Sequence, residues 1–406
     1  MSTRFKPSDS LDDVRYEIRG QLAHRAQELE LQGYDVISLN IGNPGRFGFR
    51  APETLRLAMI ENLAVSDAYC HQKGIFPARE AVVMQQQERG LMDVTSEDVF
   101  IGNGVSELID LTLRALLDLD DEVLIPSPDY PLWTAAVTLN RGKPVHYPCP
   151  PELGFQPDLD ALEALITDKT RAIVIINPNN PTGAVYPQET LQRMVDLAEK
   201  HGLIIFSDEI YEGMTYEGAE FVPVATLVKD TLVGTFSGLS KVYRACGYRV
   251  GWVSFAGAKD QAEDYLHGLE LLSSLRLCSN VPAQWAVQTA LGGYQSMQEL
   301  IQPGGRLYES RKVILDSVEA SPYLSVIAPA GSMYAFVGIN RDVLPDVDDH
   351  DFALELLESK HVLVAPGTSF NVEYNNHFRI TLLPDAETLT EVFKRIDEVL
   401  SAYDAA

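Results

Sequence analysis

The sequence predicts an α/β protein with a mostly parallel sheet covered by helices and a second, smaller α/β domain. In the middle of the chain, short apolar runs alternate with longer amphipathic stretches. Doubly buried strands in strand–helix–strand order are typical of a parallel sheet covered by helices. After the glycine-rich stretches at 292–293 and 303–305, helix and strand patterns alternate again, which predicts the smaller domain.

The spacing of apolar side chains predicts the individual elements. In the large domain we expect strands at 123–125, 172–176, 203–206, 232–236 and 250–255, with a helix at 187–201. In the smaller domain we expect helices at 306–318 and 351–359, and strands at 333–337, 362–364 and 378–382. The strand expected at 36–41 is predicted to join the smaller domain. The predicted division is an N-terminal segment at 1–45, a large domain at 46–295 and a small domain at 296–406.

The charge balance of the chain argues against two classes of partner. Its 406 residues contain 32 Lys and Arg against 58 Asp and Glu, a net charge of -26. Such a surface repels phosphate backbones and anionic headgroups, so we expect no nucleic-acid binding and no membrane docking. The acidic runs at 118–122 and 346–351 are interpreted as solvated turns.

Cysteine usage and the N-terminal sequence predict a cytoplasmic protein. The cysteines, Cys70, Cys149, Cys246 and Cys278, form no CxxC pair, and each is expected to be a buried free thiol of a reducing compartment. Residues 1–13 lack the apolar core of a secretory signal, and no apolar run approaches the ~20 residues of a membrane helix.

The most informative motif is the stretch 237–251, SGLSKVYRACGYRVG, which follows an apolar run. Lys241 comes just after a predicted buried strand, where an ammonium group is costly unless it is paired or neutralised. A lysine kept partly unprotonated can form an imine with an aldehyde, and Arg249 offers a fixed fork for a phosphate. Taken alone, Lys241 would be a surface lysine at a strand end.

Two polar motifs follow other predicted strands. In the sequence NPNNPTG at 177–183, prolines and a glycine favour a tight turn that presents the amide of Asn180. In 203–211, Asp208 follows an apolar run directly and is expected at the buried mouth of the sheet, with Tyr211 facing the same cavity. The alternatives are a turn without a ligand and an exposed acid opening a turn.

Gly104, Val105 and Ser106 begin a predicted helix whose backbone N–H groups would form an anion site. The pattern G-x-G-x-x-G fails here because Glu107 occupies the third glycine position, so one phosphate fits better than a pyrophosphate. Arg379 lies inside an apolar strand, where a guanidinium needs a carboxylate from a substrate or from a structural acid. Without other motifs, the structural acid is favoured.

Other chemistries have little support. The eight histidines show no metal-ligand spacing such as HExxH, and we expect no metal. The motifs GxxxxGK[ST] and GxSxG are both missing, which disfavours a P-loop enzyme and an α/β-hydrolase.

Taken together, these motifs resemble those of the class I/II aminotransferases of fold type I, which depend on pyridoxal 5′-phosphate. The order also matches: the phosphate loop, an aromatic residue, NPxNPTG, DxxY, SK, GxR and a late arginine follow one another along nearly the whole chain. The resemblance implies a large domain with a mostly parallel seven-stranded sheet, a smaller α/β domain, and transamination by a ping-pong mechanism.

The resemblance also implies roles for individual residues around the cofactor ring. Lys241 would bind the cofactor covalently and act as the base, and Asp208 would hold the protonated pyridine nitrogen. Asn180 and Tyr211 would bond the phenolic oxygen, and Tyr130 would stack on the ring.

The phosphate group has its own set of implied ligands. Gly104, Val105, Ser106 and Arg249 would hold it, and Tyr69 would reach the phosphate of the neighbouring subunit, which implies a homodimer. Many relatives carry Ser or Thr three residues before the lysine. This chain has Gly238 there, so we expect Ser237 or Ser240 to substitute.

For the substrate, Arg379 would bind the α-carboxylate, with Asn180 and Gly42 beside it. The segments 14–20, 177–186, 235–243 and 279–295 look most like the alanine (glutamate–pyruvate) aminotransferase branch. Tyr16 and Arg19 are the candidates for the distal carboxylate of glutamate, on an N-terminal lid; alternatively, Arg19 pairs with a surface acid.

The expected reaction therefore converts L-alanine and 2-oxoglutarate to pyruvate and L-glutamate. The alternatives are an aminotransferase for aromatic or branched-chain amino acids, a lyase for sulfur amino acids, and a non-catalytic regulatory module.

Overall fold

The largest element of the computed structural model, which describes residues 5–12, 14 and 20–404, is a seven-stranded sheet. Its strand order is β2-β8-β7-β6-β5-β3-β4, and β8 runs antiparallel to both neighbours while the other adjacent pairs are parallel. The mostly parallel sheet predicted from the sequence is thus confirmed. The strands are β2 (Val99–Gly102), β3 (Glu122–Ser127), β4 (Lys143–Pro148), β5 (Thr170–Ile176), β6 (Ile204–Asp208), β7 (Leu232–Gly238) and β8 (Gly251–Gly257).

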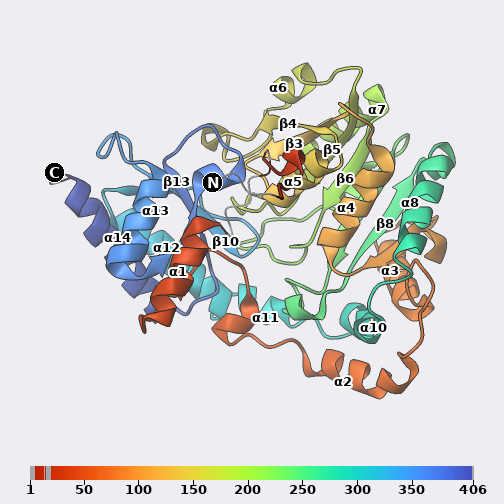
Figure 1. Ribbon diagram of the computed structural model, residues 1–406, viewed down its shortest axis with the longest axis horizontal. Coiled ribbons are helices and arrows are strands. Elements are labelled where there is room, and N and C mark those ends of the chain that lie inside the picture. Colours follow the sequence, from red (N-terminus) through yellow and green to blue (C-terminus); the bar gives the residue numbers. More distant parts are fainter. Residues whose placement is uncertain (1–4, 13, 15–19, 405–406) are drawn as a thin grey trace.

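Helices cover both faces of this sheet (Figure 1). In β5, Val174 and Ile176 pack into one apolar core, while Ile173 and Ile175 pack into the other, as the two-residue period of a strand requires. The first core is shared with α4 (Val105–Leu116), α5 (Pro131–Leu139) and α8 (Glu263–Leu275). The second core is shared with α3 (Phe76–Glu88), α6 (Leu159–Ala164), α7 (Gln188–His201) and α10 (Ala286–Gly292).

The C-terminal part forms a smaller α/β unit beside the large sheet (Figure 1). Its antiparallel sheet has the order β12-β13-β10-β9. The elements are β9 (Leu324–Val326), β10 (Tyr334–Ile339), β12 (Ala365–Pro366) and β13 (His377–Thr381), with α12 (Arg306–Ala320), α13 (Asp349–Lys360) and α14 (Ala386–Asp404).

The N-terminal part of the described chain also joins this unit. β1 (Ile37–Ser38) pairs in parallel with β11 (Val362–Leu363), which confirms the pairing expected for the N-terminal strand, although the strand is shorter than predicted. The division at residues 45 and 295 stays a prediction. The remaining helices are α1 (Gln21–Leu31), α2 (Glu53–Glu61), α9 (Val281–Gln284) and α11 (Met297–Ile301).

The polar motifs meet at one edge of the large sheet. The parallel strands β3, β5, β6 and β7 all end there. β2 runs in the same direction as β7 because β8 is antiparallel to both, so β2 also ends there and β8 begins there. Ligand sites of open α/β sheets lie at this edge. Within residues 5–12, 14 and 20–404, no helix combines the length and the apolar character needed to cross a bilayer.

Candidate active site

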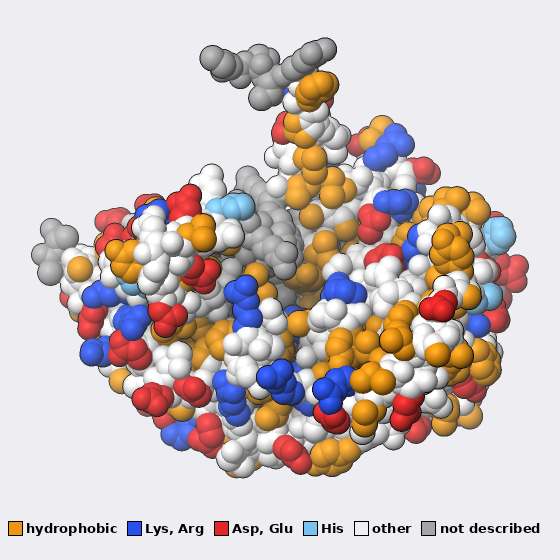
Figure 2. Space-filling view, turned by 60° about the horizontal axis from the view of Figure 1, so that its bottom comes forward, with side chains coloured by type: hydrophobic (Ala, Val, Ile, Leu, Met, Phe, Trp, Pro, Cys, Tyr) orange, Lys and Arg blue, Asp and Glu red, His pale blue; other side chains and the backbone are white. Residues whose placement is uncertain are grey.

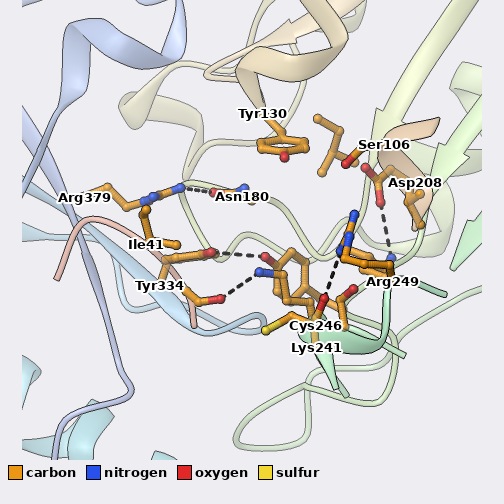
Figure 3. A pocket seen from close by; sticks show the side chains of 16 residues that line it. Ile41, Ser106, Tyr130, Asn180, Asp208, Lys241, Cys246, Arg249, Tyr334 and Arg379 are labelled. Atoms are coloured by element: carbon orange, nitrogen blue, oxygen red, sulfur yellow. Dashed lines mark hydrogen bonds between the residues drawn. The ribbon is translucent and has the colours of Figure 1, made fainter. Parts of the chain in front are cut away.

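A pocket at this edge brings together most of the residues singled out by the sequence motifs. It encloses about 820 Å³ of empty space, including part of its open mouth. Figure 3 shows side chains entering it from both sheets. Its walls are formed by Ile41, Gly42, Val105, Ser106, Tyr130, Ile176, Asn180, Asp208, Ile210, Tyr211, Ser240, Lys241, Cys246, Arg249, Tyr334 and Arg379.

Lys241 lies in this pocket and not on an open strand end. The residue comes three positions after the end of β7 and is half-buried. Its Nζ donates a hydrogen bond to the carbonyl oxygen of Gly42 at 2.9 Å, from the N-terminal part of the chain (Figure 3). A flexible amine is therefore held within the cavity, where it can reach a bound ligand.

Asp208 ends β6 and is buried, as predicted. One carboxylate oxygen accepts a hydrogen bond from Nε1 of Trp133 at 3.1 Å, and the other accepts one from the backbone N–H of Ile210 at 3.3 Å. Burial raises the pKa of Asp208 to about 6, although these two donors and the charge of Lys241 act in the opposite direction. A cationic ligand group beside this carboxylate would favour its ionised form.

Arg379 and Asn180 lie opposite Lys241 (Figure 3). Arg379 is in β13, almost fully buried, and its Nη1 donates to Oδ1 of Asn180 at 2.8 Å, while Nη2 donates to the carbonyl oxygen of Asn40. Its Cζ lies 4.2 Å from the ring centre of Tyr334. Because Arg379 engages the amide oxygen of Asn180, the NH₂ group of that amide is the side that can donate to a ligand.

The structural acid considered for Arg379 is missing from the described residues. No Asp or Glu side chain of 5–12, 14 and 20–404 forms an ion pair with it, and its buried Nε has no hydrogen-bond partner there. A buried guanidinium without a counter-charge is costly. A carboxylate ligand would supply both the missing charge and an acceptor.

Two tyrosines connect the large sheet to the small one inside the pocket. The hydroxyl of Tyr211 donates to that of Tyr334 at 3.3 Å (Figure 3). Burial raises the pKa of Tyr211 well above its usual value. Burial acts in the same direction on Tyr334, but the charges of Lys241 and Arg379 outweigh it and lower the pKa of Tyr334. Of the two hydroxyls, that of Tyr211 is the one whose neutral form is favoured by its surroundings.

The start of α4 has the geometry expected of an anion site. Gly104 has φ +86°, and a Cβ on it would collide with the guanidinium of Arg249. A Cβ on Gly251 would lie 2.6 Å from the backbone nitrogen of Val105. Only glycines allow this approach of Arg249 to the helix N-terminus, where free N–H groups and the helix dipole favour an anion. Ser106 is exposed in the first turn of the same helix.

The structure also explains the glycine three residues before the lysine. Gly238 pairs with Gly251 across β7 and β8, and a Cβ there would lie 2.8 Å from the carbonyl oxygen of Val250. A serine or threonine does not fit at this position. Of the two expected substitutes, Ser240 lines the pocket, whereas Ser237 is buried within β7 and is not among the lining residues.

The remaining predicted residues lie elsewhere. Tyr69 is 79% exposed on the surface of this chain and does not line the pocket. Tyr16 and Arg19 lie outside the described residues.

The sequence motifs did not indicate Trp133, Tyr334 or Cys246. Trp133 lies in α5, three residues after Tyr130, and is completely buried. Tyr334 begins β10, where its apolar neighbours gave no sign of a polar role. The helical i, i+3 spacing from Tyr130 is the one signal that could have indicated Trp133. Cys246 lines the pocket, contrary to the expectation of a buried structural thiol.

These residues fit pyridoxal 5′-phosphate. The glycine-lined helix start suits a phosphate, the buried Asp208 suits a cationic ring nitrogen, and Lys241 lies between them and Arg379. The unpartnered Nε of Arg379 suits a substrate carboxylate.

Comparison with known proteins agrees with this chemistry. Residues 34–396 match the family model "Aminotransferase class I and II". The chain is 48% identical over 399 residues to glutamate-pyruvate aminotransferase AlaA of Escherichia coli (strain K12), which covers 98% of both chains. It is 46% identical over 400 residues to alanine aminotransferase of Mycobacterium tuberculosis (strain H37Rv), covering 98% of this chain and 93% of the other.

A solved structure of alanine aminotransferase from Pyrococcus furiosus superimposes with a TM-score of 0.92 at 36% identity, covering 98% of this chain and all of that one. A crystal structure of an aminotransferase from Escherichia coli reaches a TM-score of 0.97 at 48% identity over 99% of both chains. The chain therefore belongs to the class I and II aminotransferases, enzymes that depend on pyridoxal 5′-phosphate.

Proposed function

We propose that this aminotransferase transfers the amino group of L-alanine to 2-oxoglutarate, which gives pyruvate and L-glutamate. The observation that carries the proposal is that Lys241 and Arg379 enter one pocket from opposite sides, with Asp208 in the same wall. The near full-length similarity to proteins named glutamate-pyruvate and alanine aminotransferase supports the choice of substrates.

In this proposal the large sheet holds the cofactor. The helix start at Val105 and Ser106, together with Arg249, binds the phosphate, and Ser240 adds a hydroxyl from the loop before the lysine. Tyr130 covers one face of the ring. When bound, pyridoxal 5′-phosphate accepts the amino group and stabilises the negative charge that develops at the substrate Cα.

The protonation of the ring nitrogen and the hydrogen bonds to the phenolic oxygen depend on Asp208, Asn180 and Tyr211. The carboxylate of Asp208 lies within reach of the donors Trp133 and Ile210, which favour its charged form against the effect of burial. That negative charge holds a proton on the ring nitrogen. The amide NH₂ of Asn180 donates to the phenolic oxygen, and the hydroxyl of Tyr211 would turn from Tyr334 to donate to the same oxygen once the ring is bound.

Lys241 moves the proton of the reaction. With the cofactor bound, Nζ of Lys241 would accept a proton from the substrate Cα and donate it to the cofactor carbon that carries the amino group. The carbonyl oxygen of Gly42, 2.9 Å from this Nζ, orients the amine within the pocket. With a 2-oxo acid as the second substrate, the same residue performs the steps in reverse order.

Arg379 selects which bond of the substrate reacts. A bidentate contact between its guanidinium and the α-carboxylate fixes the substrate, and the contact with Asn180 at 2.8 Å fixes the guanidinium. The bond lined up with the ring is then Cα–H, which leads to transamination. For the distal carboxylate of glutamate we retain Tyr16 and Arg19 as the proposed ligands.

The test is a panel of amino donors with 2-oxoglutarate and the cofactor-saturated enzyme. We expect L-alanine to give pyruvate and L-glutamate in equal amounts, and to exceed L-tyrosine, L-leucine and L-aspartate in kcat/KM. Absence of pyruvate, while another donor reacts, would overturn the choice of alanine.

The same panel separates the alternatives. Release of ammonia and pyruvate from L-cysteine or L-cystathionine without a 2-oxo acid would identify a lyase. No reaction with any donor, from a protein that binds the cofactor, would favour the regulatory module.

We also propose a homodimer in which Tyr69 reaches the active site of the second copy. Figure 2 shows hydrophobic side chains gathered on one face of the molecule. The segment that carries Tyr69 contacts α8, where Gln72 donates to Glu270 at 2.7 Å. Exposed apolar residues lie on α2 and the following turn, on α8 and just after α8: Leu57, Ile60, Leu63, Val65, Leu271, Leu275 and Leu277. Exposed apolar side chains in this number support a protein interface.

Analytical ultracentrifugation of two matched variants tests the dimer. We expect Leu275→Asp, on α8, to sediment as a monomer and to lose activity. Leu31→Asp, on the exposed side of α1, is the control and should remain a dimer. A monomeric, active wild-type enzyme would contradict the proposal.

The free state of all four cysteines supports a cytoplasmic location.

A further inference from the structure

A group of hydrogen bonds joins the segment 127–134, at the end of β3, to Phe370 and Asn371 in the C-terminal part. The backbone N–H of Asp129 donates to the carbonyl oxygen of Phe370 at 3.1 Å. The hydroxyl of Ser127 donates to the carbonyl oxygen of Asn371 at 2.7 Å. Nδ2 of Asn371 donates to Oδ1 of Asp129 at 2.9 Å and to the hydroxyl of Thr134 at 3.3 Å. We call these contacts the interdomain strap.

Each end of the interdomain strap also holds a part of the active site. On the large-sheet side, Tyr130 directly follows Asp129 and lines the pocket. On the other side, the ring centre of Phe370 lies 4.7 Å from Cζ of Arg379. The strap therefore connects the proposed cofactor-stacking residue, at the start of α5, with the proposed carboxylate-binding residue, in β13.

The chemistry of the strap requires Asp129 and Asn371 in particular. Asp129 is completely buried, and Oδ2 of its carboxylate accepts from the hydroxyl of Thr134 at 2.5 Å. Thr134 has a single hydroxyl hydrogen, which this bond uses. The contact of Thr134 with Nε2 of His146, at 2.9 Å, then requires the imidazole to donate. The amide of Asn371 donates to the other carboxylate oxygen, Oδ1 of Asp129. Without this amide, that buried oxygen would lose its hydrogen-bond donor.

The backbone of Asn371 explains the residue type. Its φ is +56°, a left-handed conformation that asparagine and glycine adopt more readily than other residues. Asparagine alone of these two also supplies the amide that bonds Asp129 and Thr134.

We propose that Asp129 and Asn371 are positioning residues, which fix the separation of Tyr130 and Arg379 and so determine how tightly the α-carboxylate of the amino acid or 2-oxo acid is held. The inference rests on the proposed function, because it takes Arg379 as the carboxylate ligand.

The primary variant is Asn371→Gly, which keeps the left-handed backbone and removes the amide. We expect KM for both the amino donor and the 2-oxo acid to rise about tenfold, as for a buried group left without its hydrogen-bond partner, with kcat within about twofold of wild type. The control is Glu373→Gln, an exposed substitution two residues along the same loop, which should leave both constants unchanged.

A second readout does not depend on activity. In hydrogen exchange of the holoenzyme, peptides covering 127–134 and 365–375 should exchange faster in Asn371→Gly than in wild type and in Glu373→Gln. The exchanged pair, Asp129→Asn with Asn371→Asp, restores one donor and one acceptor across the contact. We expect it to recover KM and protection toward wild type, relative to Asp129→Asn alone or Asn371→Asp alone.

The outcomes separate this inference from the proposed function. If wild type turns over another donor and not alanine, the proposed function fails, and the strap is measured with that donor. An unchanged KM in Asn371→Gly, a fall in kcat alone, or no rescue by the exchanged pair overturns the inference. If Asn371→Gly does not fold, the exchanged pair and its two single variants decide the question by the same measures.

Discussion

The substitution Trp133→Phe tests how Asp208 is kept charged. It removes the indole donor 3.1 Å from the carboxylate and leaves Ile210 as the remaining neutral donor in the described shell. A hydrogen bond to a charged group contributes about 1.5–3 kcal/mol, which corresponds to a rise in pKa of about 1–2 units. From its value of about 6, the pKa of Asp208 would move to or above neutrality in the cofactor-free protein.

Titration of the cofactor into the apo-protein is the assay, followed by absorbance at pH 7 and pH 9. We expect the dissociation constant of Trp133→Phe at pH 7 to exceed that of wild type by about 2–10-fold, because more of the carboxyl groups of Asp208 would be protonated in the variant. Asp208 is ionised above its pKa, so the difference between variant and wild type should narrow at pH 9.

Trp252→Phe is a matched control for this substitution. Trp252 is also buried, and its indole nitrogen has no hydrogen-bond partner among the described residues, so the same indole is lost without a bond to Asp208. Equal effects of the two variants on cofactor binding, or no pH dependence of the Trp133→Phe effect, would refute the reasoning.

Three further substitutions have expected outcomes. Arg379→Lys cannot maintain both arms of the guanidinium fork, so KM for both substrates should rise about 100-fold in steady-state assays; an unchanged KM would exclude Arg379 as the carboxylate ligand. Gly104→Ala forces a Cβ against Arg249, and fluorescence titration should find cofactor affinity reduced about tenfold, whereas wild-type affinity would contradict the phosphate site. Burial raises the pKa of Glu209 to about 7, whereas the pKa of a glutamate in the unfolded chain is about 4. Between these pH values the folded state holds a proton that the unfolded state has lost, so the stability of the protein falls as pH rises from about 4 to 7. The melting temperature of Glu209→Gln relative to wild type should therefore increase by about 3 °C between pH 5 and pH 8, and a constant difference would argue against this titration.

The strands of the large sheet could be predicted where they are buried on both faces. β5 to β8 are continuous apolar runs in the sequence, and the structure has them at nearly the expected residues. β4 (Lys143–Pro148) escaped prediction because it lies at the sheet edge, contains prolines and is half-exposed, so no apolar run marks it. β2 (Val99–Gly102) was also not predicted, because it is only four residues long.

The acidic runs show where charge patterns mislead. Asp121 was expected in a solvated turn, but it is buried and pairs with Arg171 at 2.9 Å. Asp349 is also buried, and its carboxylate accepts from the backbone and hydroxyl of Thr368. Their partners come from positions 50 and 19 residues away, and a local pattern of charges contains no information about such pairs.

The candidate site was predictable where each residue follows a strand end. Lys241, Asp208 and Asn180 all have this position, and the parallel topology brings the strand ends together. Trp133 and Tyr334 could not be found in the same way. Their roles arise from contacts with Asp208 and Tyr211, which depend on how the helix and the second sheet pack onto the first.

The covalent site of the cofactor is the central claim. Borohydride reduction of the purified holoenzyme, followed by peptide mass mapping, tests it most directly. We predict that the peptide containing Lys241 gains the mass of the reduced cofactor, and that Lys241→Ala shows no labelled peptide. Labelling of a different lysine in the wild-type enzyme, or an active enzyme with no labelled peptide, would contradict the account.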